Sequence, residues 1–383
     1  MNFQLSKSQK EIQKAAKEFA KGEFDKDLAL EQNKLQKFPQ TIRHNAAELG
    51  FIGIHFPEKY YGGGFGVFEN TLLAEEFCKK DSSMGMGLML SSFASEPVVR
   101  FGSHELKEKF LIPIADGKIL SGAAITEANS GYDITSLATT AVRDGDEWVI
   151  NGKKNYVVNG GKAGFYCVLC KTDLETSSFN SISMILVEGD RDGLSAVNTR
   201  SKLGMRMSAL SDLEFRNVRV PCTNLIGKEG RGMFQASTFY DESRILTAAM
   251  ALGTARGAFA RALDYVKQRE QFGKKIGQFE VTQHKLADMA MQIEQAAFLT
   301  YSAAINFDPK KSDSEMIAMA KISACSAALN VSSEAIQLLG GYGYMSEYEV
   351  ERCYRDSKVL EVFCGNTKNL KEIIAKNIVG NIR

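Results

Sequence analysis

The sequence has almost no net charge. Its 383 residues include 47 Lys and Arg against 46 Asp and Glu, which gives a formal charge of +1 at pH 7. Proteins that bind nucleic acid or anionic membranes carry a surplus of basic side chains. A balance this even provides no such surplus, so we expect neither nucleic acid nor a membrane as a partner.

Long apolar runs and paired cysteines are also missing. Residues 1–19 form an amphipathic pattern without the unbroken apolar stretch of a signal peptide, and no later segment is expected to span a bilayer. The seven cysteines are scattered and odd in number, which suits a reducing cytoplasm better than a disulfide framework. Cys167 and Cys170 form a CxxC inside a strand-like run, where positions i and i+3 face opposite sides, so no metal site is predicted.

The composition is that of an ordinary globular protein, with 44% hydrophobic and 24% charged residues. The hydrophobic period changes twice along the chain, from helical to alternating and back. We therefore predict an α+β fold made of an N-terminal helical domain, a middle antiparallel β-barrel or sandwich domain, and a C-terminal bundle of the four-helix type. The predicted domains are residues 1–118, 119–228 and 229–383.

The most informative stretch is residues 337–368, where an apolar helix breaks at Gly340-Gly341 and a charged helix follows. Glycines at a helix end allow backbone to approach a flat or phosphorylated ligand closely, because no Cβ is in the way. Read alone, the same pattern also describes an ordinary corner between two helices.

Six segments in order carry a resemblance that covers essentially the whole chain: AITEANSGYD, GKKNYVVNG, LGMRMSALSDLEFRNVRVP, YDESR, QREQFGKKIG and QLLGGYGY followed by YRD. With these segments the chain resembles the acyl-CoA dehydrogenase family. The resemblance implies bound FAD, an acyl-CoA or acyl-carrier-protein thioester as substrate, and a homotetramer. It also implies loss of an α-proton to a base, transfer of a β-hydride to flavin N5, and electron-transfer flavoprotein as the electron acceptor.

The resemblance assigns a set of cofactor-binding positions. Tyr156 stands where the family usually has Trp against the flavin, and Val158 where a Thr hydroxyl usually bonds near N5, so one hydrogen bond is expected to be lost. Arg269 is expected to reach the FAD pyrophosphate of a neighbouring subunit, as guanidinium suits phosphate. The whole implied set is Ile125, Thr126, Gly131, Tyr156, Val158, Arg269, Phe272, Gln337, Gly340, Gly341, Asn366 and Lys368. Without the resemblance, these would be turn, strand and solvated helix residues.

The same resemblance assigns Asp241 and Arg244 to the CoA-pantetheine side of the substrate, although an i,i+3 surface pair is the plainer interpretation. Tyr132 occupies a position at the substrate mouth where the family has Ser, which narrows or reshapes that mouth.

The catalytic base departs from the family pattern. The usual carboxylate immediately precedes the glycine of the last segment, and here that residue is Cys364, a shorter and normally protonated side chain. A minority of the family carries the base directly before the position of Arg244, and here that residue is Ser243. Glu242 lies one position earlier, about 100° around the helix, and is the preferred candidate for a displaced base, ahead of Glu361.

Three functions remain open at this point. The first is a flavin dehydrogenase of acyl thioesters with a displaced base. The second is different flavin chemistry, such as an oxidase or a reaction in which Cys364 acts as acid or nucleophile. The third is a flavin- or acyl-binding protein without catalysis.

Overall fold

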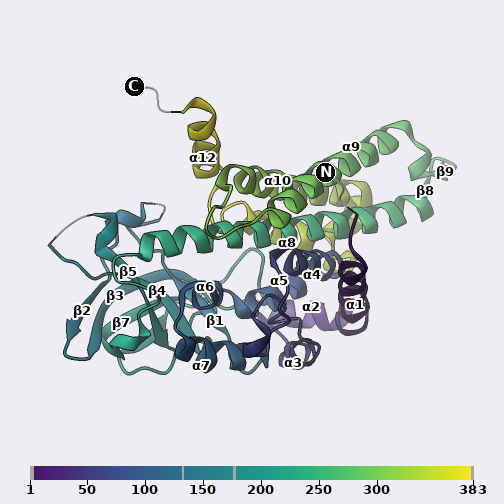
Figure 1. Cartoon of the computed structure of the whole chain (residues 1–383). Coiled ribbons are helices and arrows are strands. Elements are labelled where there is room, and N and C mark those ends of the chain that lie inside the picture. Colours follow the sequence, from purple (N-terminus) through teal and green to yellow (C-terminus); the bar gives the residue numbers. More distant parts are fainter. Residues whose placement is uncertain (1–3, 132, 176–177, 381–383) are drawn as a thin grey trace.

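The structure is a computed structural model that describes residues 4–131, 133–175 and 178–380. A helical region, a sheet and a second helical region follow one another along the chain (Figure 1), which confirms the expected α+β architecture. Helix caps set the first elements: the Ser6 hydroxyl accepts from Gln9 N at 3.2 Å, and the Asp81 carboxylate accepts from Met84 N at 2.9 Å. The N-terminal helices are α1 (Lys7–Glu23), α2 (Lys26–Leu35), α3 (Gln40–Glu48), α4 (Val67–Lys80), α5 (Ser82–Met89), α6 (Glu96–Phe101) and α7 (His104–Ala115).

The middle region is one curled sheet with the strand order β1-β4-β2-β3-β7-β6, in which β5 also pairs with β4. Its strands are β1 (Ser121–Ala124), β2 (Thr140–Asp144), β3 (Glu147–Val158), β4 (Phe165–Lys171), β5 (Ile182–Glu188), β6 (Leu194–Val197) and β7 (Leu210–Pro221). The expectation of an antiparallel unit is wrong for β4, which pairs in parallel with β1 and, at Thr140 and Lys171, with β2. Alternating side chains indicate which face of a strand is buried but not the direction of the strand, so parallel pairing cannot be predicted from this pattern.

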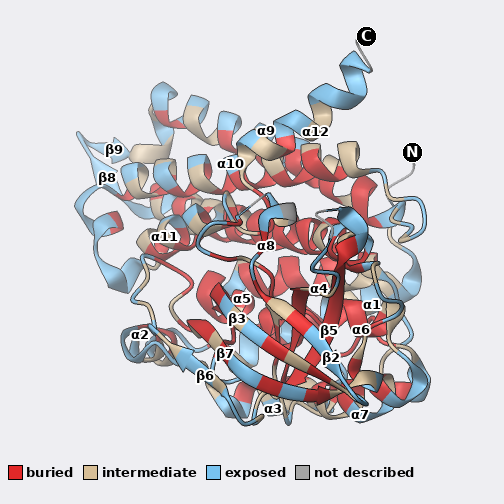
Figure 2. Ribbon diagram, turned by 90° about the vertical axis from the view of Figure 1, so that its left-hand side faces the viewer, coloured by how far each residue is buried: buried red, intermediate tan, exposed pale blue. Residues whose placement is uncertain are grey.

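The C-terminal helices form a bundle around one long central helix. They are α8 (Gly232–Gln268), α9 (Glu280–Ile305), α10 (Ser314–Leu339), α11 (Val350–Leu360) and α12 (Thr367–Val379), with a small hairpin of β8 (Glu270–Gln271) and β9 (Lys274–Lys275). Helix α8 runs from the sheet to that hairpin (Figure 1), and α9, α10 and α11 pack along it, while α12 packs against α10. Its middle is almost wholly buried, as the red ribbon in Figure 2 shows. Because α8 contacts N-terminal helices, strands β4 and β5 and three other bundle helices, it positions the site described below.

One segment of the described chain, Ser314–Tyr344, is long and apolar enough to cross a membrane, with a mean hydropathy of 1.2. The sequence-based expectation that no segment passes this test was therefore wrong. The reason is that 56% of the apolar window is buried in the bundle, and a core helix has the same composition as a spanning helix.

Candidate active site

A cavity of about 380 Å³ lies between the sheet and the bundle. Its wall brings together residues that are far apart in the sequence, and six of them were expected at the site: Ile125, Thr126, Gly131, Tyr156, Val158 and Cys364. The segment after β1 supplies Ile125, Thr126 and Gly131, strand β3 supplies Tyr156 and Val158, and the turn after α11 supplies Cys364. The structure thus joins the expected flavin-ring positions and the expected base position in one hollow.

Local geometry of the sheet presents the first of these residues to the cavity. Backbone N–H of Asn155 donates to Thr126 O at 2.7 Å, so the segment after β1 is tied to β3. A register shift between Lys154 and Val157 interrupts the pairing of β3 with β7, and Tyr156 between them has φ 56°. The Tyr156 side chain consequently turns outward and is 58% exposed.

The exposed ring of Tyr156 is held by its neighbours. The Arg200 guanidinium lies 4.6 Å from the ring centroid, and Arg200 also pairs with Asp212 at 2.7 Å. Asp212 in turn accepts from the backbone N–H of Tyr156 at 3.1 Å. A fixed aromatic face at the mouth of a cavity suits a flat ligand. Neither residue was expected here: Arg200 lies outside the six segments, and Asp212 lies inside LGMRMSALSDLEFRNVRVP, but no role was assigned to it.

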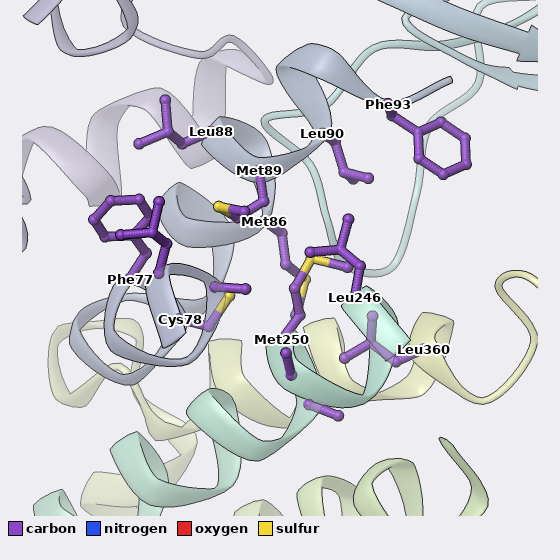
Figure 3. Close-up of a cluster of buried hydrophobic side chains, with 14 of the residues drawn as sticks. Phe77, Cys78, Met86, Leu88, Met89, Leu90, Phe93, Leu246, Met250 and Leu360 are labelled. Atoms are coloured by element: carbon purple, nitrogen blue, oxygen red, sulfur yellow. The ribbon is translucent and has the colours of Figure 1, made fainter. Parts of the chain in front are cut away.

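Three aromatic rings form one part of the cavity wall. Phe93 lies 5.2 Å from Phe239 and 5.2 Å from Phe363, measured between ring centroids. Behind these rings, buried Met and Leu side chains of α5, α8 and α11 fill the space (Figure 3), including Met86, Leu246 and Leu360. The three rings come from three separate elements, so no local sequence pattern could have identified this wall.

Cys364 sits in the turn after α11 with φ 53°, an unusual conformation for a residue other than glycine. Burial raises the pKa of its thiol to about 12, and the positive charges of Lys321 and Arg244 offset only part of that rise. The thiol therefore stays protonated at neutral pH. Among the described residues that line the cavity, none is Asp or Glu.

Glu242 does not reach this cavity. Its carboxylate forms two bonds with the Arg100 guanidinium, at 3.1 and 2.9 Å, on the side of α8 that faces α6. Glu96 lies nearby, and burial together with the charge of Glu242 raises the pKa of the Glu96 carboxyl to about 8. The structure thus separates Glu242 from Cys364. Glu361 also lies outside the cavity wall, paired with Lys358 at 2.5 Å.

Asp241 and Arg244, expected on the substrate side, are both buried and bind each other at 2.7 Å. Arg244 Nε also donates to the carbonyl oxygen of Cys364 at 3.0 Å. The second Asp241 oxygen accepts from the hydroxyls of Ser312 and Ser314, each at 2.7 Å. In this arrangement the pair supports the turn of Cys364 and does not line the cavity.

The remaining cofactor positions lie elsewhere. Arg269, Gln337, Gly340 and Gly341 line a second, open pocket of about 550 Å³ at the far end of α8. A Cβ at Gly340 or Gly341 would meet no atom within 4 Å, so the backbone there faces open space. Phe272 projects beyond this pocket and is 94% exposed.

The structure does not bring Asn366 or Lys368 to either pocket. Asn366 caps α12 by accepting from Asn369 N at 3.0 Å, and the Lys368 side chain is 85% exposed. Tyr132 lies outside the described residues.

Comparisons with known proteins agree over the whole chain. Three family profiles match in order: the acyl-CoA dehydrogenase N-terminal domain at residues 6–118, the middle domain at 122–218 and the C-terminal domain at 230–379. The short-chain-specific acyl-CoA dehydrogenase of Clostridium acetobutylicum is 36% identical over 99% of this chain and 100% of its own length. The acryloyl-CoA reductase (NADH) of Anaerotignum propionicum is 35% identical over 99% and 96%. A chain in the structure of the electron transferring flavoprotein of Acidaminococcus fermentans superposes with a TM-score of 0.95, at 36% identity and 100% coverage of both chains.

Proposed function

The chain belongs to the acyl-CoA dehydrogenase family, and we propose that it exchanges hydrogen at the α,β-carbons of an acyl thioester with the Cys364 thiol in place of a carboxylate. The observation that carries this proposal is the cavity itself, which has a protonated thiol at the expected base position and no carboxylate in its described wall. A protonated group at that position favours the saturating direction, in which the α-carbon of an enoyl thioester receives a proton.

The family is FAD-dependent, and the residues of this chain fit that cofactor. A Cβ at Gly131, Gly340 or Gly341 would meet open space, and Tyr156 presents a fixed aromatic face. The cavity residues Ile125, Thr126, Tyr156 and Val158 would hold the flavin ring, and the second pocket with Arg269 and Gln337 would hold the dinucleotide. When bound, FAD supplies hydride exchange with the β-carbon of the thioester.

The distance between the two pockets supports an assembly of more than one chain. Tyr240 lines the cavity and Arg269 lines the second pocket. They are separated along α8 by 29 residues, or roughly 43 Å at the rise of an α-helix. One dinucleotide does not reach across that length, so the second pocket would serve the FAD of another subunit. This supports the expected homotetramer, in which Phe272 and the hairpin beside it would contact the neighbour.

The proton at the α-carbon would come from Cys364. A thiol with a pKa of about 12 is a far stronger acid than a thioester α-carbon, so donation to that carbon is downhill. The opposite direction first needs a thiolate. At pH 7 its formation costs about 7 kcal/mol, which is five pKa units at about 1.36 kcal/mol each. Glu242 is not available for this role while it is paired with Arg100.

The partners follow from the same proposal. The substrate would be an acyl-CoA or acyl-carrier-protein thioester, and an electron-transfer flavoprotein would exchange electrons with the bound FAD in the cytoplasm. The relatives support both directions of exchange, since one is a dehydrogenase and another is an acryloyl-CoA reductase. The structural similarity to a chain from an electron transferring flavoprotein structure supports such a redox partner.

The test uses the FAD-loaded protein under anaerobic conditions with matched panels of saturated and α,β-unsaturated thioesters. We expect unsaturated thioesters to restore the flavin colour of pre-reduced protein much faster than saturated ones bleach the oxidised protein at pH 7. Cys364→Ala should slow the restoration by at least 100-fold, the usual contribution of a general acid. Full activity of Cys364→Ala, or no colour change with any thioester, would refute the proposal.

A further inference from the structure

Lys321 of α10 contacts the turn that contains Cys364. Its side chain is almost wholly buried, with 1% exposure for the residue. The ammonium donates to Glu361 O at 2.8 Å and to Gly365 O at 2.6 Å. These two carbonyls lie at the two ends of the turn, so the Lys321 side chain connects both ends.

A second buried cation holds the same turn between those points. Arg244 Nε donates to Cys364 O at 3.0 Å, so the carbonyls of Glu361, Cys364 and Gly365 are all bound to cationic donors. The turn has φ 53° at Cys364 and 129° at Gly365, two successive positive values. A conformation of this kind persists only where surrounding contacts impose it, and the two cations supply those contacts.

The chemical setting of Lys321 is unusual for a buried lysine. A buried ammonium is normally paired with a carboxylate, because an unpaired buried charge is strongly unfavourable. Among the ion pairs of the described residues, none includes Lys321, and burial lowers the pKa of its ammonium. One partner, Glu361 O, lies at the C-terminal end of α11, where the helix dipole favours a cation, and the other, Gly365 O, lies in the turn before α12. The Lys321 ammonium is therefore bound by the carbonyl oxygens of this turn.

We infer that Lys321 is a positioning residue, which fixes the turn so that the side chain of residue 364 faces the substrate α-carbon in the cavity. The inference rests on the proposed role of Cys364. This role would explain why a buried cation, Lys321, lies next to the site without lining the cavity. Lys321 acts only through the carbonyls of the turn and does not itself touch the substrate.

A purely stabilising role makes a different prediction. If Lys321 only caps α11, its loss should loosen α10 and α11 together. If it positions residue 364, loss of its two bonds should release mainly the turn. The two roles therefore differ in which backbone amides become exposed to solvent. A melting temperature does not report this location, so it cannot distinguish the two roles.

Hydrogen exchange followed by mass spectrometry tests this in the FAD-loaded protein. In Lys321→Met, amide exchange in the peptide covering residues 361–366 should rise at least tenfold, with the middle of α10 unchanged. Lys321→Gln keeps an N–H donor on a shorter arm and should give a smaller rise. Ser332→Ala is the matched control, since it removes another buried hydrogen bond of α10, to Ala328 O at 2.6 Å, and should leave residues 361–366 unchanged.

The kinetic arm measures saturation of an unsaturated thioester. Lys321→Met should lower the rate about 100-fold, as expected for a misplaced reacting group, while the thioester affinity changes less than threefold. Unchanged exchange at residues 361–366 in both variants, or a rise spread evenly over α10 and α11, overturns the inference. Full activity of Cys364→Ala would instead refute the proposed function, and the exchange result would still decide whether Lys321 fixes the turn.

Discussion

The pH dependence of thioester oxidation gives the sharpest test of Cys364. Burial raises the pKa of its thiol to about 12, so the proton stays on sulfur across the physiological range. Only the thiolate can accept an α-proton, and its fraction is roughly 10⁻⁵ at pH 7. The fraction grows about tenfold for each pH unit until the pH approaches the pKa.

The rate of oxidation of a saturated thioester should follow that fraction. Between pH 6 and pH 9 we expect a rise of roughly 1,000-fold, with a slope of one on a logarithmic plot. The saturating direction uses the protonated thiol and should stay flat over the same range. Stopped-flow measurement of flavin absorbance under anaerobic conditions follows both directions with the same protein.

Cys364→Glu provides the matched comparison. A carboxyl starts from an ordinary pKa near 4.3, far below that of a thiol. Burial at this position should raise that pKa, but oxidation by this variant should still become independent of pH at a much lower pH than oxidation by the wild type. Gln is similar in size to Glu but has no titrating group. Cys364→Gln should therefore lose the pH dependence of oxidation and most of the oxidation rate. A wild-type oxidation rate that is flat with pH and survives in Cys364→Gln would show that another group takes the proton.

Three further results are expected. Glu242→Gln should leave both redox rates within threefold of wild type and lower the free energy of unfolding by about 2 kcal/mol, because Arg100 loses a paired partner; a 100-fold loss of oxidation in an otherwise stable variant would make Glu242 the base after all. Gly341→Val places its side chain in open space, so FAD should be lost on gel filtration while the thermal unfolding of the apoprotein is unchanged, and full FAD retention would remove this pocket from the cofactor site. Phe272→Asp changes a side chain that is 94% exposed; light scattering should show dissociation of the assembly together with loss of FAD, and an intact assembly with bound FAD would contradict the shared site.

The sequence by itself determined the order of the domains and the identity of the family. Helical and alternating periods are local properties, so the change from helix to strand and back was visible without coordinates. The direction of β1 was not visible, because β1 meets β4 only after an intervening hairpin, in parallel. The apolar composition of α10 likewise could not say whether its apolar side chains face lipid or a protein core.

The candidate site, like the fold, was predicted only in part from the sequence. The motif positions predicted which residues of the middle region would meet Cys364, and the structure places Ile125, Thr126, Tyr156 and Val158 in one cavity with it. Whether a carboxylate reaches the cavity or pairs with another side chain depended on the tertiary structure. Glu242 is bound by Arg100, which is 142 residues away along the chain, and no local pattern contains that contact.

The state of Cys364 is likewise a tertiary property. Its pKa depends on burial between the sheet and the bundle, and its position depends on Lys321 and Arg244, which come from two other helices. A sequence specifies which chemical groups exist, because side-chain identity is covalent. Which of those groups lose water and acquire charged neighbours is decided only when distant segments pack together.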